Sequence, residues 1–218
     1  MIDVITLQII AGILLVSSLL IIYQVNFRRK GEEEPLKVKK TAEFSSFVKM
    51  IGGLVTFLIP MGAVLLLFVV PTLVYETSLN FYFYGDTAVQ VLGTVLYFGG
   101  GALLVWSSNH LGMFHTDTII FAEEHFLVDT GPYSRVRHPG YTGTLMLAMA
   151  DLLIMLNVIL ALNVIAVTLY FMYRARIEEE FLKSPGALGN QYLEYMRRTG
   201  RFLPKLLKKT DNLGTEKK

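Results

Sequence analysis

The sequence of 218 residues contains no cysteine. This absence excludes a disulfide framework, a metal site ligated by cysteine, and a cysteine nucleophile. Charged residues are also scarce, at 17% of the chain, whereas a soluble domain has roughly 25%. With 53% hydrophobic residues and a formal net charge of only +2, the composition excludes a disordered chain, gives no indication of nucleic-acid binding, and indicates a membrane protein.

Three long stretches lack Asp, Glu, Lys and Arg, namely Val4 to Phe27, Met50 to Tyr75 and Thr87 to Thr116. Each exceeds the roughly 20 residues that a helix needs to cross the hydrocarbon core of a bilayer. The sequence therefore predicts three spanning helices. We interpret the first as a retained anchor, since no basic segment precedes it.

Proline and glycine occur inside two of these predicted helices. Pro60 has no N–H group to donate to the preceding turn, so we expect it to kink the second helix. In the third helix, Gly93 and the run Gly99 to Gly101 would allow another helix to approach closely.

A fourth apolar stretch runs from Tyr141 to Tyr173 and is interrupted only by Asp151. It is too short for two full-length spans joined by an ordinary loop, so we predict a tight helical hairpin that turns near Asn157. Each arm would reach about 24 Å, which requires a locally thinned bilayer or an extension into the cytosol. For Asp151 we expect a hydrogen bond to a neighbouring helix, because an ionisable group inside the membrane is costly.

Lysine and arginine occur in three places: residues 28–49, Arg135 with Arg137, and the segment from residue 174 onward. The loop at 71–86 has none. Basic residues favour the cytosolic side of a membrane, so we predict an external N-terminus and a cytosolic C-terminus.

The predicted fold is an all-α integral membrane protein with five transmembrane helices, the last two forming the hairpin 141–173. Residues 1–106 would hold the three N-terminal helices and a cytosolic linker at 28–46, and residues 107–218 a cytosolic loop, the hairpin and a C-terminal amphipathic helix. That helix would lie on the membrane surface or against the other cytosolic loop. Its amphipathic character comes from aromatic and apolar residues placed beside arginines: Tyr192, Tyr195, Met196 and Phe202 beside Arg197, Arg198 and Arg201.

All four histidines lie in or beside the long cytosolic loop, at His110, His115, His125 and His138. Without cysteine or an H-E-x-x-H pattern, we predict no metal site. The glycine run at 99–101 lies inside an apolar helix, so it is not a dinucleotide or P-loop motif. A nucleotide-like ligand would need another kind of binding site.

The loop that leads into the hairpin is the first candidate site. Gly131-Pro132 is a turn signal, and Pro139 suits the first turn of a helix. Free backbone N–H groups at that helix start would suit a small anionic or zwitterionic ligand. The alternative is a loop that is only shaped by these residues and anchored by its aromatics.

The second candidate site is the charged segment at the end of the hairpin. Arg174 and Glu178 are four residues apart, on one face of a helix, and Glu179 and Glu180 follow. The alternative is an arginine that reaches back to the membrane interface beside a solvated acidic helix end.

These two segments, in this order around a short hairpin, resemble the family of isoprenylcysteine carboxyl methyltransferases and phospholipid methyltransferases. The similarity covers residues from about Leu111 to Pro204. It is carried by Leu111-Gly, His125-x-Leu-Val-x-x-Gly-x-Tyr133, Arg137-His-Pro-x-Tyr141, Arg174-x-x-x-Glu178-Glu179, and Leu188-Gly-x-x-Tyr-x-x-Tyr195 with Arg201 and Pro204. The segment Lys183 to Ala187 makes the chain about two residues longer than is usual in the family, so we expect the C-terminal helix to start in a shifted place.

The resemblance implies methyl transfer from S-adenosyl-L-methionine, leaving S-adenosyl-L-homocysteine, to a lipophilic or prenylated acceptor that enters from the bilayer. The best-known reaction is carboxyl O-methylation of an isoprenylcysteine. A phospholipid amine, a quinone-like isoprenoid or a small thiol is an alternative acceptor. A reductase that uses NADPH is a second enzyme alternative, and a small membrane transporter or scaffold is an alternative of another class. Membrane lipids are expected partners, and neither nucleic acid nor an obligate protein partner is expected.

The resemblance also implies roles for individual residues. Arg174 would bind the acceptor, and Arg174 and Glu178 would be the catalytic residues. The methyl donor would bind at His125, Phe126, Leu127, Val128, Tyr133, His138, Pro139, Gly140, Tyr141 and Glu178. An anionic nucleophile needs little acid–base help, so proximity and desolvation should supply most of the acceleration. With an amine or a thiol as acceptor, Glu178 or His138 would act as base.

Overall fold

The computed structural model describes residues 2–26, 38–42, 44–75, 77–111, 119–122 and 127–205. In these residues, four helical segments are long and apolar enough to cross a membrane, and one shorter apolar helix accompanies them. The long ones are α1 (Val4–Asn26), the joined segments α2 (Ser46–Gly53), η1 (Leu54–Leu58) and α3 (Ile59–Val69), then α4 (Asp86–Leu111) and α6 (Val158–Leu182); the shorter one is α5 (Pro139–Met155). The chain is therefore a multi-pass integral membrane protein.

The second spanning segment is interrupted by a π-helical turn just before Pro60. The Ile59 N–H group donates to the carbonyl of Leu54, five residues back instead of four. Pro60 has no N–H group, so the helical hydrogen-bond ladder has to change at this point. The segment ends at Val69 and not at the predicted Tyr75, because Pro71 starts the 3-10 turn η2 (Pro71–Leu73).

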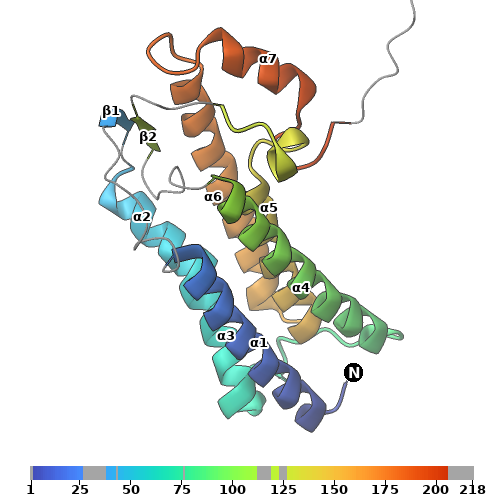
Figure 1. Ribbon diagram of the computed structural model, residues 1–218. Coiled ribbons are helices and arrows are strands. Elements are labelled where there is room, and N and C mark those ends of the chain that lie inside the picture. Colours follow the sequence, from blue (N-terminus) through green and yellow to red (C-terminus); the bar gives the residue numbers. More distant parts are fainter. Residues whose placement is uncertain are drawn as a thin grey trace, which may run out of the picture.

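Helices α4 and α5 run side by side and meet through glycines (Figure 1). A Cβ atom on Gly100 would lie 2.9 Å from the Gly143 carbonyl oxygen, and a Cβ atom on Gly143 would lie 2.9 Å from that of Gly100. Gly93 lies equally close to α5, where its Cβ atom would be 2.8 Å from Leu153 Cβ. The prediction that glycines allow close helix approach is confirmed for Gly93, Gly100 and Gly101, the last of which lies against Ile21 of α1, but not for Gly99.

We expect Gly100→Ala to destabilise the fold by about 1–3 kcal/mol, because the added methyl group would overpack the α4–α5 contact. Gly99→Ala is the matched control, since its Cβ atom would meet only Met146 Cε, at 3.5 Å. Both changes improve helix propensity equally. Thermal unfolding in detergent should show a lower midpoint for the Gly100 variant alone, and equal midpoints would contradict this packing.

Helices α5 and α6 form the predicted hairpin. Leu156 adopts a left-handed conformation with φ of 48°, and the Asn157 side chain caps α6 by accepting from the Ile159 N–H group at 2.9 Å. The predicted turn near Asn157 is confirmed. The predicted hairpin 141–173 is too short, since α6 continues to Leu182, and the predicted helical face of Arg174 and Glu178 is part of this continuation. An apolar run marks only the part of a helix that faces lipid, whereas the backbone hydrogen bonds continue through the charged residues beyond it.

One end of the bundle holds the N-terminus and the hairpin turn. The Gln90 side chain accepts from the Ile2 N–H group at 2.8 Å and donates to the Ile154 carbonyl at 2.7 Å. Asn80, in the loop before α4, donates to the Met155 carbonyl at 2.8 Å. These bonds hold the start of the chain, the loop that lacks lysine and arginine, and the hairpin turn together.

The opposite end, which we call the α7 end, carries helix α7 (Asn190–Arg198) and a pair of short strands (Figure 1). Strand β1 (Val38–Ala42) pairs antiparallel with β2 (Ile119–Ala122). The prediction of an all-α chain did not include this small sheet, which joins the predicted linker 28–46 to the predicted cytosolic loop. The described part of α4 ends at Leu111, and the rest of the predicted third helix lies outside the described residues.

Candidate functional site

A cavity of about 670 Å³ extends through the α7 end of the bundle into the space between the membrane helices. All of the spanning helices contribute to its walls, together with the loop before α5 and helix α7. Eight of the predicted site residues line it: Leu127, Val128, Tyr133, His138, Gly140, Tyr141, Arg174 and Glu178. Pro139 is the buried first residue of α5, whereas His125 and Phe126 lie outside the described residues.

The predicted turn at Gly131-Pro132 is the 3-10 turn η4 (Gly131–Ser134). Gly131 has φ of +56°, and a Cβ atom on it would lie 2.3 Å from the His110 ring. Only glycine tolerates both conditions. This contact packs the turn against the end of α4 and directs Tyr133 to the cavity.

The loop before α5 is paired with the chain after α7. The backbone N–H groups of Arg137 and His138 donate to the carbonyls of Gly200 and Arg201, at 2.8 and 3.1 Å. The prediction that free N–H groups here bind a ligand is therefore wrong for these two residues, because the C-terminal segment occupies them. Pro139 does start α5, as predicted.

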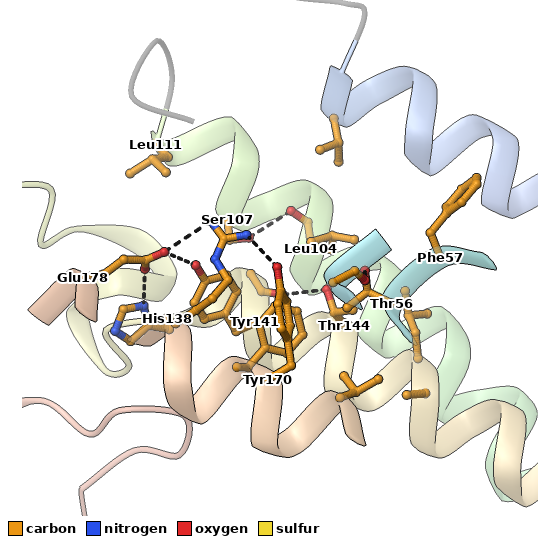
Figure 2. A pocket seen from close by; sticks show the side chains of 18 of the residues that line it. Thr56, Phe57, Leu104, Ser107, Leu111, His138, Tyr141, Thr144, Tyr170 and Glu178 are labelled. Atoms are coloured by element: carbon orange, nitrogen blue, oxygen red, sulfur yellow. Dashed lines mark hydrogen bonds and ion pairs between the residues drawn. The ribbon is translucent and has the colours of Figure 1, made fainter. Parts of the chain in front are cut away.

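Glu178 contacts three of the predicted site residues, and Figure 2 shows His138 and Tyr141 beside it. One oxygen of its carboxylate accepts a hydrogen bond from the Tyr141 hydroxyl, and the other lies 3.5 Å from His138 Nδ1. Arg174 Nη2 lies 3.4 Å from the same carboxylate. The His138 and Tyr141 rings stack in parallel, with their centroids 5.2 Å apart. The structure thus brings four predicted residues together around one partly exposed carboxylate.

The Arg174 guanidinium lies among aromatic rings at the cavity wall. Its Cζ atom is 4.8 Å from the Phe44 ring centroid, 5.6 Å from that of Tyr141 and 5.9 Å from that of Tyr170. These distances are within the range of cation–π attraction. Sequence reasoning did not select Phe44 or Tyr170, although Tyr170 precedes Arg174 by one helical turn.

Glu179 is the main residue that sequence reasoning left without a role. Its side chain is 2% exposed, and it accepts from Arg137 Nε at 2.9 Å and from Arg201 Nη2 at 2.5 Å. The hydrogen bond that Arg201 donates to Glu179 raises the pKa of the Arg201 guanidinium. Val167, Phe171 and Ala175 precede it at four-residue steps and are also buried, a pattern that could have revealed it.

Helix α7 packs against the loop before α5. The Tyr195 hydroxyl donates to the Tyr133 carbonyl at 2.6 Å, and Tyr192 and Tyr195 are buried. This burial raises the pKa of both phenols. On the rim, Arg198 pairs with Asp129. Two positions were predicted for this helix, on the membrane surface or against the other cytosolic loop. The structure supports the second.

Together the helices and the cavity define a multi-pass membrane protein with a charged, partly buried site at one end of its bundle. Residues 91–183 match the model of the isoprenylcysteine carboxyl methyltransferase (ICMT) family. This match and the curated relatives support the resemblance that the motifs indicate.

Three curated relatives illustrate the similarity. The human protein-S-isoprenylcysteine O-methyltransferase is 32% identical over 83 residues, which are 38% of this chain and 29% of the human protein. The enzyme of the same name from Saccharomyces cerevisiae is 34% identical over 82 residues, 37% of this chain and 34% of the yeast protein. Protein-S-isoprenylcysteine O-methyltransferase B from Arabidopsis thaliana is 35% identical over 83 residues, which are 38% of this chain and 41% of the Arabidopsis protein. The matches thus span less than half of these relatives.

The fold is similar to the solved structure of the eukaryotic intramembrane Ras methyltransferase ICMT. The TM-score is 0.54, and the similar region covers 89% of this chain and 63% of that one, at 18% identity. At this level of identity the comparison shows the fold alone. This coverage extends beyond residues 91–183, which the family model matches.

Proposed function

We propose that this protein transfers a methyl group from S-adenosyl-L-methionine to the carboxylate of an isoprenylcysteine or a similar lipophilic acid. The family match and the names of the relatives support this reaction. The observation that carries the proposal is the convergence of Glu178, Arg174, His138 and Tyr141 on one cavity that continues between the membrane helices.

The residues at the α7 end fit the methyl donor. A cavity of about 670 Å³ lies within the range of small-molecule sites, roughly 300–1,000 Å³. Glu178 offers a carboxylate to a cationic ligand, while Tyr133 and Tyr141 offer aromatic surface. When bound, the donor supplies an electrophilic methyl group on a sulfonium. Leu127, Val128, Pro139 and Gly140 would complete its site, as would His125 and Phe126 from the same motif.

Arg174 favours an acid as acceptor over a phospholipid amine. Its planar guanidinium can hold both oxygens of a carboxylate, which fixes the direction of the nucleophile. A carboxylate is already anionic, so the site needs no general base. We assign the acceleration to alignment, and to the exclusion of water by α7 and the chain after it.

We further propose that the N-terminus is external and that the site and the C-terminus are cytosolic. The N-terminus and the loop without lysine or arginine lie at one end of the bundle, and the basic residues of the site lie at the other. This arrangement agrees with the bias of basic residues toward the cytosol. Residues 107–218 would form the catalytic part, and helices from residues 1–106 would complete the acceptor side of the cavity.

Calorimetric binding of S-adenosyl-L-homocysteine in lipid nanodiscs tests the proposal. We expect Glu178→Gln to weaken binding on the order of 10–100-fold, because it removes a charge-assisted interaction. Glu180→Gln is the matched control, since Glu180 is 74% exposed and pairs with Lys183. Absence of binding by the unsubstituted protein would overturn the proposed function. Unchanged binding by the Glu178 variant would remove this residue from the donor site.

A further inference from the structure

Asp151 is a buried carboxyl group that the proposed chemistry does not use. It lies in α5, is 3% exposed, and lines the same cavity as Glu178 and Arg174. Its Oδ1 atom has no hydrogen-bond partner in the part of the chain that the structure describes. The predicted hydrogen bond to another helix is therefore not made by this oxygen. Buried polar groups are almost always paired, so a carboxyl group on a cavity wall with an unpaired oxygen indicates a missing ligand group.

The neighbouring polar groups are already engaged with one another. Tyr97 also lines the cavity and lies within electrostatic range of Asp151. Its hydroxyl, however, is bonded to the Leu14 carbonyl at 3.1 Å and to Ser18 Oγ at 2.5 Å. Thr144, another residue of the wall, donates to the Gly140 carbonyl at 3.2 Å. None of these hydroxyl groups donates to Asp151.

The position of Asp151 relative to the chemistry follows from the helix. Asp151 and Tyr141 lie on α5, ten residues apart, so they are about 15 Å apart along its axis. Tyr141 contacts Glu178 and marks the end where the methyl group would be transferred. Apolar side chains line much of the wall, among them Phe57, Val64 and Ala148. An acceptor chain that enters from the bilayer would therefore pass an unpaired carboxyl group well away from its reacting end.

We propose that Asp151 selects acceptors whose lipid chain carries a hydroxyl group about 15 Å from the methylated atom. This inference rests on the proposed function and deepens it by naming the class of acceptor. A hydroxyl can donate to the Asp151 carboxyl group whether this group is ionised or protonated. A plain hydrocarbon chain leaves this carboxyl group without a ligand partner, and sites built to bind a hydroxyl reject analogues that lack it.

Two synthetic acceptors that differ only in this group provide the test. They are N-acetyl-S-farnesylcysteine and its counterpart with a hydroxyl on the terminal isoprene unit. Their affinities are measured by calorimetry in nanodiscs saturated with S-adenosyl-L-homocysteine, so the result does not depend on turnover. We expect the unsubstituted protein to bind the hydroxylated chain at least about tenfold more tightly. Asp151→Asn should keep this preference, because the amide oxygen still accepts, whereas Asp151→Leu should reverse it.

The outcomes separate this inference from the proposed function. Equal affinities for the two chains, or a preference that survives Asp151→Leu, would show that Asp151 has a structural role only and would overturn the inference. Failure of every variant to bind either chain would overturn it as well. Binding of S-adenosyl-L-homocysteine, measured on each variant first, tests the proposed function independently of these results.

Discussion

Glu179→Gln should lower the stability of the protein by about 3 kcal/mol, because it removes one partner of a buried ionic network. The carboxylate of Glu179 holds Arg137 and Arg201, which belong to the loop before α5 and to the chain after α7. Arg137 in turn donates to the Thr199 carbonyl at 2.5 Å. Neutralising Glu179 leaves a guanidinium that is 8% exposed without its counter-charge. The loop and the C-terminal segment should then separate from α6.

Glu178→Gln is a matched comparison, since it makes the same chemical change one residue earlier in the same helix. Glu178 lies at the cavity and is 17% exposed, so we expect its substitution to change donor binding with little effect on unfolding. Denaturation of both variants in one detergent should give a much lower midpoint for the Glu179 variant. Equal midpoints would show that the network does not hold the α7 end together.

The membrane helices were predictable because the bilayer imposes their length and composition. The hairpin was predictable because its apolar run is too short for two spans, and the turn lies at Asn157 as predicted. The π-helical turn before Pro60 and the continuation of α6 to Leu182 were not predictable from apolar runs. Both depend on backbone hydrogen bonding, which hydropathy does not record.

The site was predictable where its residues are close in sequence. Arg174 and Glu178 share a helical face, and the structure places them 3.4 Å apart. The role of Glu179 was not predictable in this way, because its partners Arg137 and Arg201 lie 42 and 22 residues away. The four-residue spacing of buried residues in α6 indicates that Glu179 is buried, but its partners follow from the tertiary fold.

Arg174→Lys should reduce kcat/KM for an acid acceptor on the order of 100-fold, although it keeps the positive charge. The guanidinium presents a planar fork that matches a carboxylate, whereas a lysine ammonium is a point charge with rotating donors. The Arg174 guanidinium is also held in place by its contacts with Phe44, Tyr141 and Tyr170. The smaller ammonium group of lysine would lose these contacts. The acceptor carboxylate would then be less well aligned with the methyl group.

The expected loss of kcat/KM comes from weaker binding and poorer alignment of the acceptor, and not from weaker donor binding. Calorimetry with S-adenosyl-L-homocysteine should therefore give nearly the same affinity for the Arg174 variant, while steady-state kinetics with a prenylcysteine acid show a raised KM. Arg176→Lys is the control, since Arg176 is an exposed residue of the same helix. If Arg174→Lys weakened donor binding as strongly as turnover, Arg174 would act through Glu178, which lies 3.4 Å away, and would not be the acceptor residue.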